Sequence, residues 1–342
     1  MAQELRIGLI GCGAMGQGHA TVWGRTPGAR LAAVFDTARE RSEAAAAQAG
    51  AAAFADLGAM LASGLIDAVD IATPSGLHAD QGLAAADAGL HVICEKPLDL
   101  SIEKADRLIA ACRSRRLTLA CILQRRTYAG AGAVTRAIHQ GRMGRLLSCC
   151  AYIKWWRSQE YYDAAGWRGT WAMDGGVLAN QAIHAIDHLC WMAGPVAEVE
   201  YANLQAVGHD MEAEDHALAV VRFESGCRGV IEATTCCSPP LCSRVEVYGT
   251  SGSASFDDAR VVTFGVDGAD CLREVPQEAA GLGGRADPMS ISMMGHEALF
   301  ADFVEAVRDG RKPLVSGDDA RPGVDALNRI YRKAYPNQRL GT

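Results

Sequence analysis

A glycine-rich turn placed directly after the first apolar run is the strongest constraint on this chain. Residues 5–10 (LRIGLI) lead into residues 11–16 (GCGAMG), and a helical stretch follows. Asp36 stands twenty residues after Gly16, at the end of a second apolar run. In this context the first glycine permits a tight turn, the second lets the backbone approach a pyrophosphate, and the third lets the helix pack on the strand. The pattern predicts a strand–turn–helix unit that holds a dinucleotide at the helix N-terminus. The alternative is a glycine-rich turn that binds nothing.

Asp36 also indicates which dinucleotide is bound. A carboxylate at this position accepts hydrogen bonds from a ribose 2′-hydroxyl and repels a 2′-phosphate, so NAD is favoured over NADP. Arg39 and Arg41 follow closely and could contact a 2′-phosphate, or they could be solvated charges on a helix face.

Composition excludes several classes of partner. The chain has 342 residues, enough for two domains, with 49% hydrophobic and 21% charged residues. Its net charge is −7 and it has no basic block, so we predict no nucleic-acid partner. No apolar run is long enough to span a bilayer, and the first expected strand leaves no room for a signal peptide. We therefore expect a cytoplasmic protein with no membrane partner.

The 12 cysteines include no CxxC pair. In a chain without an export signal, they are expected to be reduced, buried thiols, and their spacing does not indicate zinc.

The order of the apolar runs predicts the fold class. The first 125 residues alternate short apolar runs with helical stretches, which is typical of a parallel sheet with helices on both faces. From about residue 133, strands follow one another with short turns, which indicates an antiparallel sheet. We predict an α/β protein with a doubly wound Rossmann domain at 1–125. A second, α+β domain at 126–342 would contain a large, mostly antiparallel open sheet.

The expected strands of the first domain are Arg6–Ile10, Leu31–Asp36, Ala51–Phe54, Ala68–Ala72, His91–Cys94 and Leu117–Cys121. Those of the second are Leu146–Trp156, Val196–Gln205, Ala217–Phe223, Arg228–Thr235, Arg244–Tyr248 and Ala254–Asp257.

Lys96 is the first candidate for chemistry. It lies in the run Glu95-Lys96-Pro97, at the end of the fifth expected strand, where it would face the crevice that holds a dinucleotide. Its ammonium could bond a substrate oxygen and stabilise negative charge as it forms. The alternative is a surface lysine at a strand end.

The segment after Gly175-Gly176 supplies the second candidate. A helix is expected over Gly176–Met192, on which Asn180, His184 and Asp187 would share one face. His184 has the type of side chain that a general base near neutral pH requires. The alternative is a hydrogen-bonded core histidine, and the neighbouring His188 is interpreted as structural.

Together these motifs resemble the glucose–fructose oxidoreductase / inositol dehydrogenase (Gfo/Idh/MocA) family. The matching positions are the glycine turn with His19, Thr73-Pro74 with His78, the run around Lys96, and the segment that carries His184. The resemblance covers nearly the whole chain. It implies NAD(P)-dependent oxidation or reduction at a ring carbon of a sugar, glycoside or cyclitol.

The resemblance also implies roles for individual residues. Lys96 and His184 would be the catalytic pair, with Asn180 orienting the substrate. Much of the family has Asp where this chain has Asn180, which cannot ionise, so the role of the base falls to His184. The coenzyme would be bound by Gly11, Gly13, Ala14, Met15, Gly16, Asp36, Thr73, Pro74, His78, Glu95, Lys96, Gln124, Trp167 and Arg168. The substrate would be bound by Lys96, Trp156, Arg157, Tyr162, Asn180, Gln181 and His184.

Residues 152–171 hold seven of the fourteen Trp and Tyr residues of the chain. Such rings suit the apolar face of a sugar, and Lys154, Arg157 and Arg168 among them could meet a carboxylate or phosphate. The cluster could equally serve the core or an interface between subunits. The pair Trp167-Arg168 matches a family pair near the nicotinamide.

The run from His209 to His216 contains four acids and could be mistaken for a metal site. A solvated turn with acids at a strand edge is the favoured interpretation, because no redox step here needs a metal. We predict no metal.

Three functions remain in view. The first is an NAD(P)-dependent sugar or cyclitol dehydrogenase acting on a ring carbon, with C3 favoured by resemblance to the branch that oxidises pyranosides and nucleotide-linked sugars. The second is an NAD-dependent glycoside hydrolase or lyase that acts through a transient keto-sugar. The third is a non-catalytic NAD(H)-binding regulator. The resemblance further implies a homodimer or homotetramer that associates through the sheet of the second domain.

Overall fold

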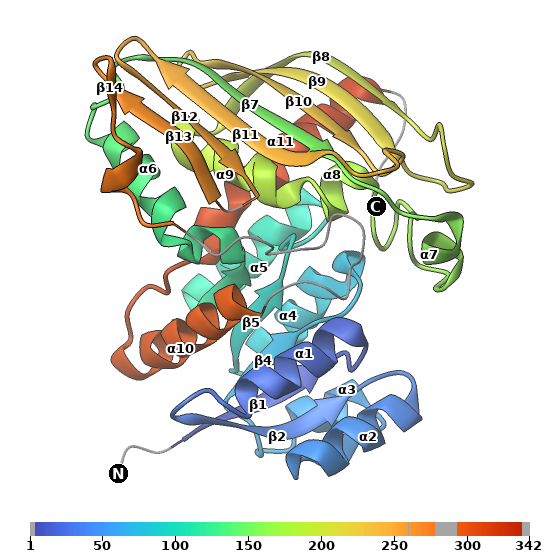
Figure 1. Ribbon diagram of the computed structural model, residues 1–342. Coiled ribbons are helices and arrows are strands. Elements are labelled where there is room, and N and C mark those ends of the chain that lie inside the picture. Colours follow the sequence, from blue (N-terminus) through green and yellow to red (C-terminus); the bar gives the residue numbers. More distant parts are fainter. Residues whose placement is uncertain (1–3, 259, 278–292, 337–342) are drawn as a thin grey trace. The chain divides into compact units, whose positions relative to one another are not determined.

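The computed structural model describes residues 4–258, 260–277 and 293–336 (Figure 1). The chain divides into two compact units. The described parts of Met1–Gln124 and Met293–Arg321 form the first unit, and those of Arg125–Ser292 and Pro322–Thr342 form the second. The sequence-based division placed all of residues 126–342 in the second domain, whereas residues 293–321 belong to the first unit. The reason is core packing, because the ring of Phe300 stacks on that of Trp23 with 4.2 Å between centroids.

The first unit is built on a parallel sheet in the order β3-β2-β1-β4-β5-β6, which confirms the predicted doubly wound architecture. All four residues of β4 are buried, as expected where helices cover both faces. The strand order reverses between β1 and β4, and ligands bind at the carboxyl ends of strands at such a point. The strands are β1 (Leu5–Ile10), β2 (Ala29–Phe35), β3 (Ala52–Phe54), β4 (Ala68–Ile71), β5 (His91–Glu95) and β6 (Leu119–Ile122).

The helices of the first unit lie next to the strands of its sheet (Figure 1). Side-chain caps begin two of them: Asp56 accepts the N–H of Ala59, and Ser101 accepts that of Lys104. The helices are α1 (Ala14–Trp23), α2 (Arg39–Ala49), α3 (Leu57–Leu61), α4 (His78–Asp87), α5 (Ile102–Ser114) and α10 (Met294–Asp309). Two short 3₁₀ turns, η1 (Ser75–Leu77) and η2 (Gln124–Thr127), follow β4 and β6.

The second unit is built on an eight-stranded sheet in the order β14-β13-β12-β11-β7-β10-β9-β8. Every neighbouring pair is antiparallel except β7 with β10, so the prediction of a mostly antiparallel sheet is confirmed. The strands are β7 (Leu146–Lys154), β8 (Val196–Gln205), β9 (His216–Phe223), β10 (Arg228–Thr234), β11 (Cys242–Gly249), β12 (Gly252–Asp257), β13 (Arg260–Val266) and β14 (Ala269–Asp270).

The described residues of the second unit also form the helices α6 (Ala129–His139), α7 (Gln159–Asp163), α8 (Val177–Asn180), α9 (Ile183–Ala193) and α11 (Gly317–Ala334), which begins in the first unit. A 3₁₀ turn, η3 (Leu272–Glu274), follows β14. The sequence analysis did not predict α6, α7, β13 or β14. In α6 the glycines at 130 and 132 weaken the helical pattern, yet a Cβ at Gly130 would lie 2.6 Å from the carbonyl oxygen of Pro276. Tertiary packing therefore explains why Gly130 is required there.

The predicted continuous helix over Gly176–Met192 is wrong. The structure has one turn of helix, α8, then a break at residues 181–182, then α9. The N–H of Ala182 bonds the carbonyl of Val177, five residues back, at 2.8 Å, which widens the turn and ends α8. Asn180 and His184 therefore lie on different helices, and the expected single face does not exist.

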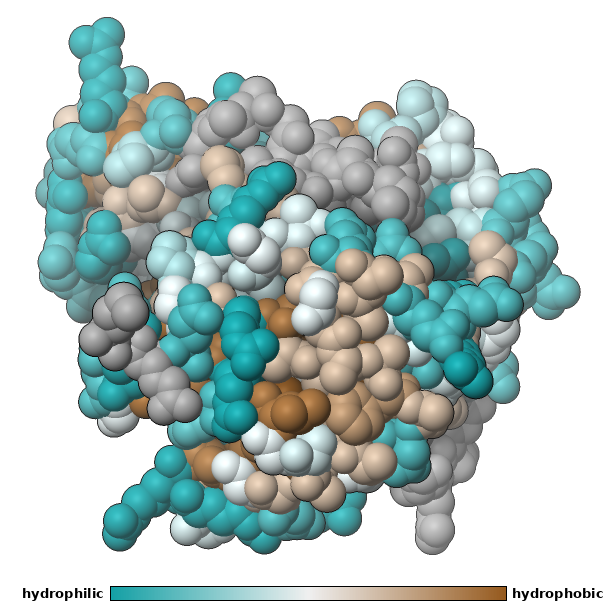
Figure 2. All heavy atoms as spheres, turned by 90° about the horizontal axis from the view of Figure 1, so that it is seen from below, coloured by the Kyte–Doolittle hydropathy of each residue, from teal (hydrophilic) through white to brown (hydrophobic). Residues whose placement is uncertain are grey.

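Among the described residues, every helix is too short or too polar to cross a lipid bilayer. The face drawn in Figure 2 carries teal and tan atoms, with dark brown confined to small areas. The atoms coloured on that face therefore form no broad, strongly apolar patch.

Candidate active site

The glycine turn between β1 and α1 shows why each of its glycines is needed. Gly11 has a φ of +93°, and a Cβ there would lie 2.7 Å from the carbonyl oxygen of Ala72. A Cβ at Gly16 would overlap the carbonyl oxygen of Gly11, so the helix passes against the turn. A Cβ at Gly13 would meet nothing within 4 Å. The turn is thus closed on its protein side and open at Gly13, where a phosphate could approach the backbone.

The surroundings of this turn also fit a dinucleotide. Gly13 is the N-cap of α1 and has no side chain to cap the helix, so the N–H groups of Ala14 and Met15 begin a helix N-terminus suited to an anion. Asp36 accepts the N–H of Cys12 at 2.8 Å and that of Ala38 at 2.7 Å, which places its carboxylate beside the turn. These residues would hold NAD, with its pyrophosphate at α1 and a ribose at Asp36.

We expect Asp36→Asn to lower the preference for NADH over NADPH by about tenfold or more, because it removes a charged acceptor and its repulsion of a 2′-phosphate. Asparagine keeps one acceptor oxygen, which can still take the N–H of Cys12, and loses the bond from Ala38. Fluorescence titration with both coenzymes measures the ratio of dissociation constants. An unchanged ratio would contradict the assignment of Asp36 to the ribose.

His78 connects the two loops that follow β4 and β5. Its ring nitrogens lie 2.9 Å from the carbonyl oxygen of Thr73 and 2.7 Å from that of Pro97, and the residue is buried. Thr73 is also held by its own hydroxyl, which donates to Gln81 at 2.7 Å. Pro74 lies next to Thr73 and precedes η1. The loops that carry Thr73 and Lys96 are therefore fixed to one another through a buried imidazole.

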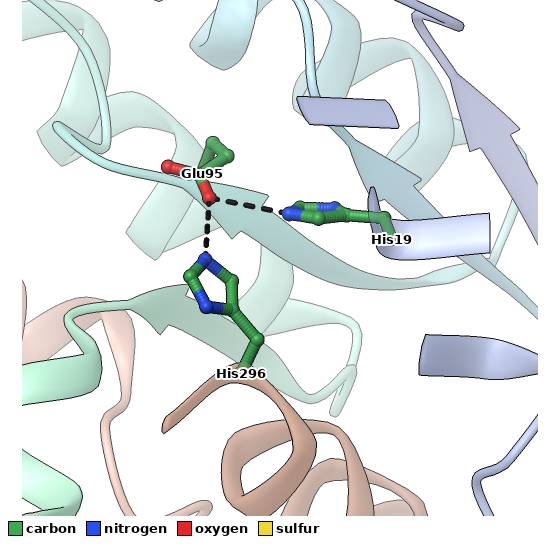
Figure 3. A group of neighbouring side chains, drawn as sticks. All are labelled: His19, Glu95 and His296. Carbon is green, nitrogen blue, oxygen red and sulfur yellow. Dashed lines mark hydrogen bonds and ion pairs between the residues drawn. The ribbon is translucent and has the colours of Figure 1, made fainter. Parts of the chain in front are cut away.

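Lys96 is half-buried and directly follows Glu95, the last residue of β5. One oxygen of Glu95 accepts the main-chain N–H of Lys96 at 3.0 Å. The other lies 3.2 Å from Nε2 of His19 and 3.3 Å from Nε2 of His296 (Figure 3). Burial disfavours the Glu95 carboxylate, but the hydrogen bonds from both histidines hold its pKa well below the usual value.

His19 is enclosed between two carboxylates. Its Nδ1 lies 3.0 Å from Asp70, which also accepts the indole N–H of Trp23 at 2.7 Å. Burial favours the neutral ring, but Asp70 and Glu95 together raise the pKa of His19 to about 10. Because both ring nitrogens face carboxylate oxygens, His19 is an imidazolium that donates on both sides.

Two groups of described residues bring metal-ligating atoms together. The first is His19, Glu95 and His296, whose atoms lie within 4.8 Å of one another. Protons account for these contacts, since His19 is an imidazolium and donates to Glu95. The second is His209, Asp215 and Cys236. There His209 is bonded to Asp215 at 2.9 Å, and burial raises the pKa of Cys236 to about 11, which favours the thiol when no metal is bound. We assign no metal to either group.

In the second unit, Asn180 is held by Asp174. The amide of Asn180 donates to Asp174 at 2.5 Å, and the other oxygen of that carboxylate accepts the N–H of Gly169 at 2.9 Å. His184 lies in the first turn of α9 and is buried, as is Gln181 in the break between the helices. The structure thus places these three residues around one helix break.

Glu214 supports the start of α8, and its burial corrects the interpretation of residues 209–216 as a solvated turn. Glu214 and Asp215 are both fully buried. The carboxylate of Glu214 accepts the N–H of Leu178 at 3.0 Å and the hydroxyl of Tyr331 at 3.1 Å, and its carbonyl accepts the N–H of Val177. A Cβ at Gly176 would overlap this carboxyl group, which explains the glycine there.

The environment of Glu214 disfavours its charge. Burial is the largest cause, the nearby Asp174 adds to it, and together they raise the pKa of Glu214 to about 7. One of its carboxyl oxygens has no hydrogen-bond partner among the described residues. Asp215 differs: it accepts N–H groups from three successive residues, 207–209, and its pKa is lowered despite burial.

Asp187 and His188 are packed into the interior of the second unit. Arg126 donates to both oxygens of Asp187, at 2.9 and 2.6 Å, and this pair is almost fully buried. His188 is buried with its ring edge against Phe256, and burial lowers its pKa to about 3. Asp187 therefore belongs to a buried ion pair with Arg126.

The aromatic segment mixes buried and accessible groups. Tyr162 is buried and its hydroxyl bonds that of Thr235 at 2.8 Å. Arg157 is also buried, with its guanidinium bonded to the carbonyl of Trp156 at 2.7 Å. Arg168 is partly exposed and lies over the ring of Tyr161, 4.2 Å from its centroid. Trp156 and Trp167 are likewise partly exposed.

Gln124, one of the predicted coenzyme residues, is the last residue of the first segment of the first unit. It is half-buried and begins η2. A Cβ at Gly295 would lie 2.7 Å from the Cβ of Gln124, so the start of α10 packs closely on it.

Asp70, Asp174, Glu214 and His296, which hold the predicted residues in place, were not among the site residues predicted from the sequence. The double glycine at 175–176 was the signal that something must approach α8 closely, but it does not identify Glu214. Nothing near His296 in the sequence points to Glu95, which is 201 residues away.

Comparison with known proteins agrees with this geometry. Residues 5–122 match the model described as "Oxidoreductase family, NAD-binding Rossmann fold", and residues 132–255 match the "GFO/IDH/MocA C-terminal domain". The chain is similar to the WlbA dehydrogenase of Bordetella pertussis, whose crystal structure is a complex with NADH and UDP-GlcNAcA. The two share 33% identity with a TM-score of 0.88, over 100% of this chain and 99% of that one.

The chain is also similar in sequence to two curated dehydrogenases. Levoglucosan dehydrogenase of Pseudarthrobacter phenanthrenivorans is 29% identical over 306 residues, 78% of each chain. Myo-inositol 2-dehydrogenase of Thermotoga maritima is 25% identical over 344 residues, 98% of this chain and 97% of that protein.

Proposed function

Because this chain belongs to the Gfo/Idh/MocA oxidoreductase family, we propose that it is an NAD-dependent dehydrogenase acting on a ring carbon of a sugar, with C3 of a nucleotide-linked sugar as the favoured position. The observation that carries this proposal is the place of Lys96. It follows β5, on the same edge of the parallel sheet as the glycine turn that follows β1. An ammonium group at this edge suits a substrate bound beside the nicotinamide.

The proposed chemistry divides between two side chains. Lys96 donates a hydrogen bond to the substrate hydroxyl oxygen and stabilises the negative charge that develops there. His184 accepts the hydroxyl proton as the carbonyl forms, and Asn180, held by Asp174, orients the substrate. When bound, NAD supplies the acceptor for the hydride that leaves the ring carbon.

The choice of substrate class rests on the likeness to WlbA, which extends over the whole chain and whose structure contains UDP-GlcNAcA. Arg168 could meet a carboxylate or phosphate of such a substrate, since the residue is partly exposed and its guanidinium lies over the ring of Tyr161. Free sugars and cyclitols are the other candidates, as substrates of the levoglucosan and myo-inositol dehydrogenases that the chain resembles.

The test is NADH formation by the purified protein with NAD or NADP, against UDP-linked sugar acids, UDP-sugars, free sugars, glycosides and inositols. We expect NADH with NAD and a UDP-linked sugar acid. Demonstrated NADH binding without NADH formation from any class would overturn the proposal. Release of a leaving group without net NADH would instead indicate a hydrolase or lyase that works through a transient keto-sugar.

We further propose that the open face of the sheet in the second unit is covered by another copy of the chain. Leu218 is exposed and in register with Glu232, Tyr152 and Arg244 on successive strands, and the exposed Tyr248 shares that face. A homodimer or homotetramer is expected, as light scattering of the purified protein will measure. A monomer at micromolar concentration would contradict it.

A further inference from the structure

His296 is a buried polar residue that neither the coenzyme turn nor the proposed chemistry uses directly. It lies at the start of α10, is 1% exposed, and directs Nε2 at Glu95 (Figure 3). Glu95 is 201 residues away in sequence and adjoins the proposed catalytic lysine. A polar side chain brought so far into a core needs a partner, and here the partner is the residue before Lys96.

We propose that His296 is a positioning residue for Lys96, acting through the carboxylate of Glu95; this inference rests on the proposed function. His296 donates from Nε2 to one oxygen of Glu95 at 3.3 Å, and the other oxygen accepts the main-chain N–H of Lys96 at 3.0 Å. The chain of contacts therefore runs from α10 to the backbone of the lysine.

His296 adds a second donor to the Glu95 oxygen that His19 also bonds, and so further restricts rotation of the carboxylate about its last side-chain bond. His19 holds Glu95 from one direction at 3.2 Å, and His296 holds the same oxygen from another. His19 cannot follow a rotating carboxylate, since its Nδ1 is bonded to Asp70 at 3.0 Å. With His296 in place, the second oxygen of Glu95 stays directed at the N–H of Lys96.

The position of His296 is itself fixed by apolar packing. Phe300, one turn later on α10, stacks on Trp23. Its ring also makes a T-shaped contact with that of His19, with 5.1 Å between the ring centroids. Trp23 in turn donates to Asp70 at 2.7 Å. Residues of α1 and α10 thus hold the histidines in place, and Glu95 receives both bonds in a largely buried position.

The experiment compares His296→Leu, which removes the donor, with His296→Gln, whose side-chain amide can donate from a similar place. Phe303→Leu is the matched control, because Phe303 is a fully buried residue of the same helix. We expect His296→Leu to lower kcat by about tenfold to a hundredfold with little change in the KM of the sugar, as misplacement of a catalytic group does. His296→Gln should recover most of that loss, and Phe303→Leu should lower Tm but keep kcat.

A second readout needs no substrate. The chain has five lysines, so protein labelled with 15N-lysine gives five main-chain amide signals, and the Lys96 signal is the one missing from Lys96→Met. We expect His296→Leu to shift the Lys96 signal and leave the other four in place, whereas Phe303→Leu leaves the Lys96 signal unshifted.

An unmoved Lys96 signal in His296→Leu would overturn the proposal, as would an activity loss in Phe303→Leu or His296→Gln equal to that of His296→Leu. If the wild type oxidises no sugar, the proposed function fails, while the amide signal still decides whether His296 positions Lys96.

Discussion

Replacing Lys96 with methionine is expected to lower kcat by about a hundredfold to ten-thousandfold and to leave NADH binding largely unchanged. Methionine has nearly the length of lysine but no charge and no donor, so the substrate oxygen would lose its hydrogen bond and the stabilisation of its developing charge. The backbone N–H of residue 96 remains available to Glu95, so the turn should keep its shape. Steady-state NADH formation measures kcat, and fluorescence titration measures NADH affinity.

Lys104→Met is the control for this experiment. Lys104 lies in the same unit and forms an ion pair with Asp80 at 2.8 Å near the surface. Its loss removes one lysine from the same region without touching the proposed chemistry, so kcat should stay near that of the wild type. A Lys96→Met variant with wild-type kcat would show that Lys96 takes no part in the reaction.

Glu214 gives the second large expected effect. Relative to Glu214→Gln, the wild type should lose about 3 kcal/mol of unfolding free energy as pH rises from about 4.5 to about 7. Burial raises the pKa of Glu214 from an ordinary value of 4.5 to about 7, so the folded state holds its proton more tightly than the unfolded state does. The stabilisation from that proton is therefore complete below pH 4.5 and is lost as pH rises through about 7.

Glutamine keeps an oxygen for Leu178 and Tyr331 but has no charge at any pH. Urea unfolding of both proteins across this range, followed by tryptophan fluorescence, gives the difference in unfolding free energy. Glu212→Gln, which removes an exposed carboxylate two residues earlier, controls for the loss of one negative charge. Parallel curves for the wild type and Glu214→Gln would show that Glu214 does not change its ionisation in this window.

Local patterns were sufficient for much of the fold. The glycine turn, the alternation of strands and helices up to residue 125, and most strands of the second sheet were predicted because each is encoded within a few neighbouring residues. The pieces that were missed depend on contacts far along the chain. The glycines of α6 weaken its helical pattern, and the need for Gly130 becomes clear only from its close packing against Pro276. The helix α10 was assigned to the second domain because its apolar face gives no indication of which core it joins.

The candidate site divides in the same way. Lys96, Asn180 and His184 stand in motifs that the sequence displays directly, and their proposed roles follow from those motifs. The helix break between Asn180 and His184 was not predictable, because a single shifted hydrogen bond at Ala182 ends α8. The acids at 214 and 215 were taken for solvated charges, since sequence alone does not reveal that Tyr331 and α8 enclose one of them.

By itself, the sequence determined the class of fold and the dinucleotide turn and predicted which side chains to propose for the chemistry, because these depend on residue type and on spacing within a few turns of chain. Only the tertiary structure decided which carboxylates are buried and which groups hold the proposed residues. Glu95 with His296, and Gly176 with Glu214, are partners separated by many residues. The energy of a buried charge depends on everything packed around it, and that environment exists only after the chain has folded.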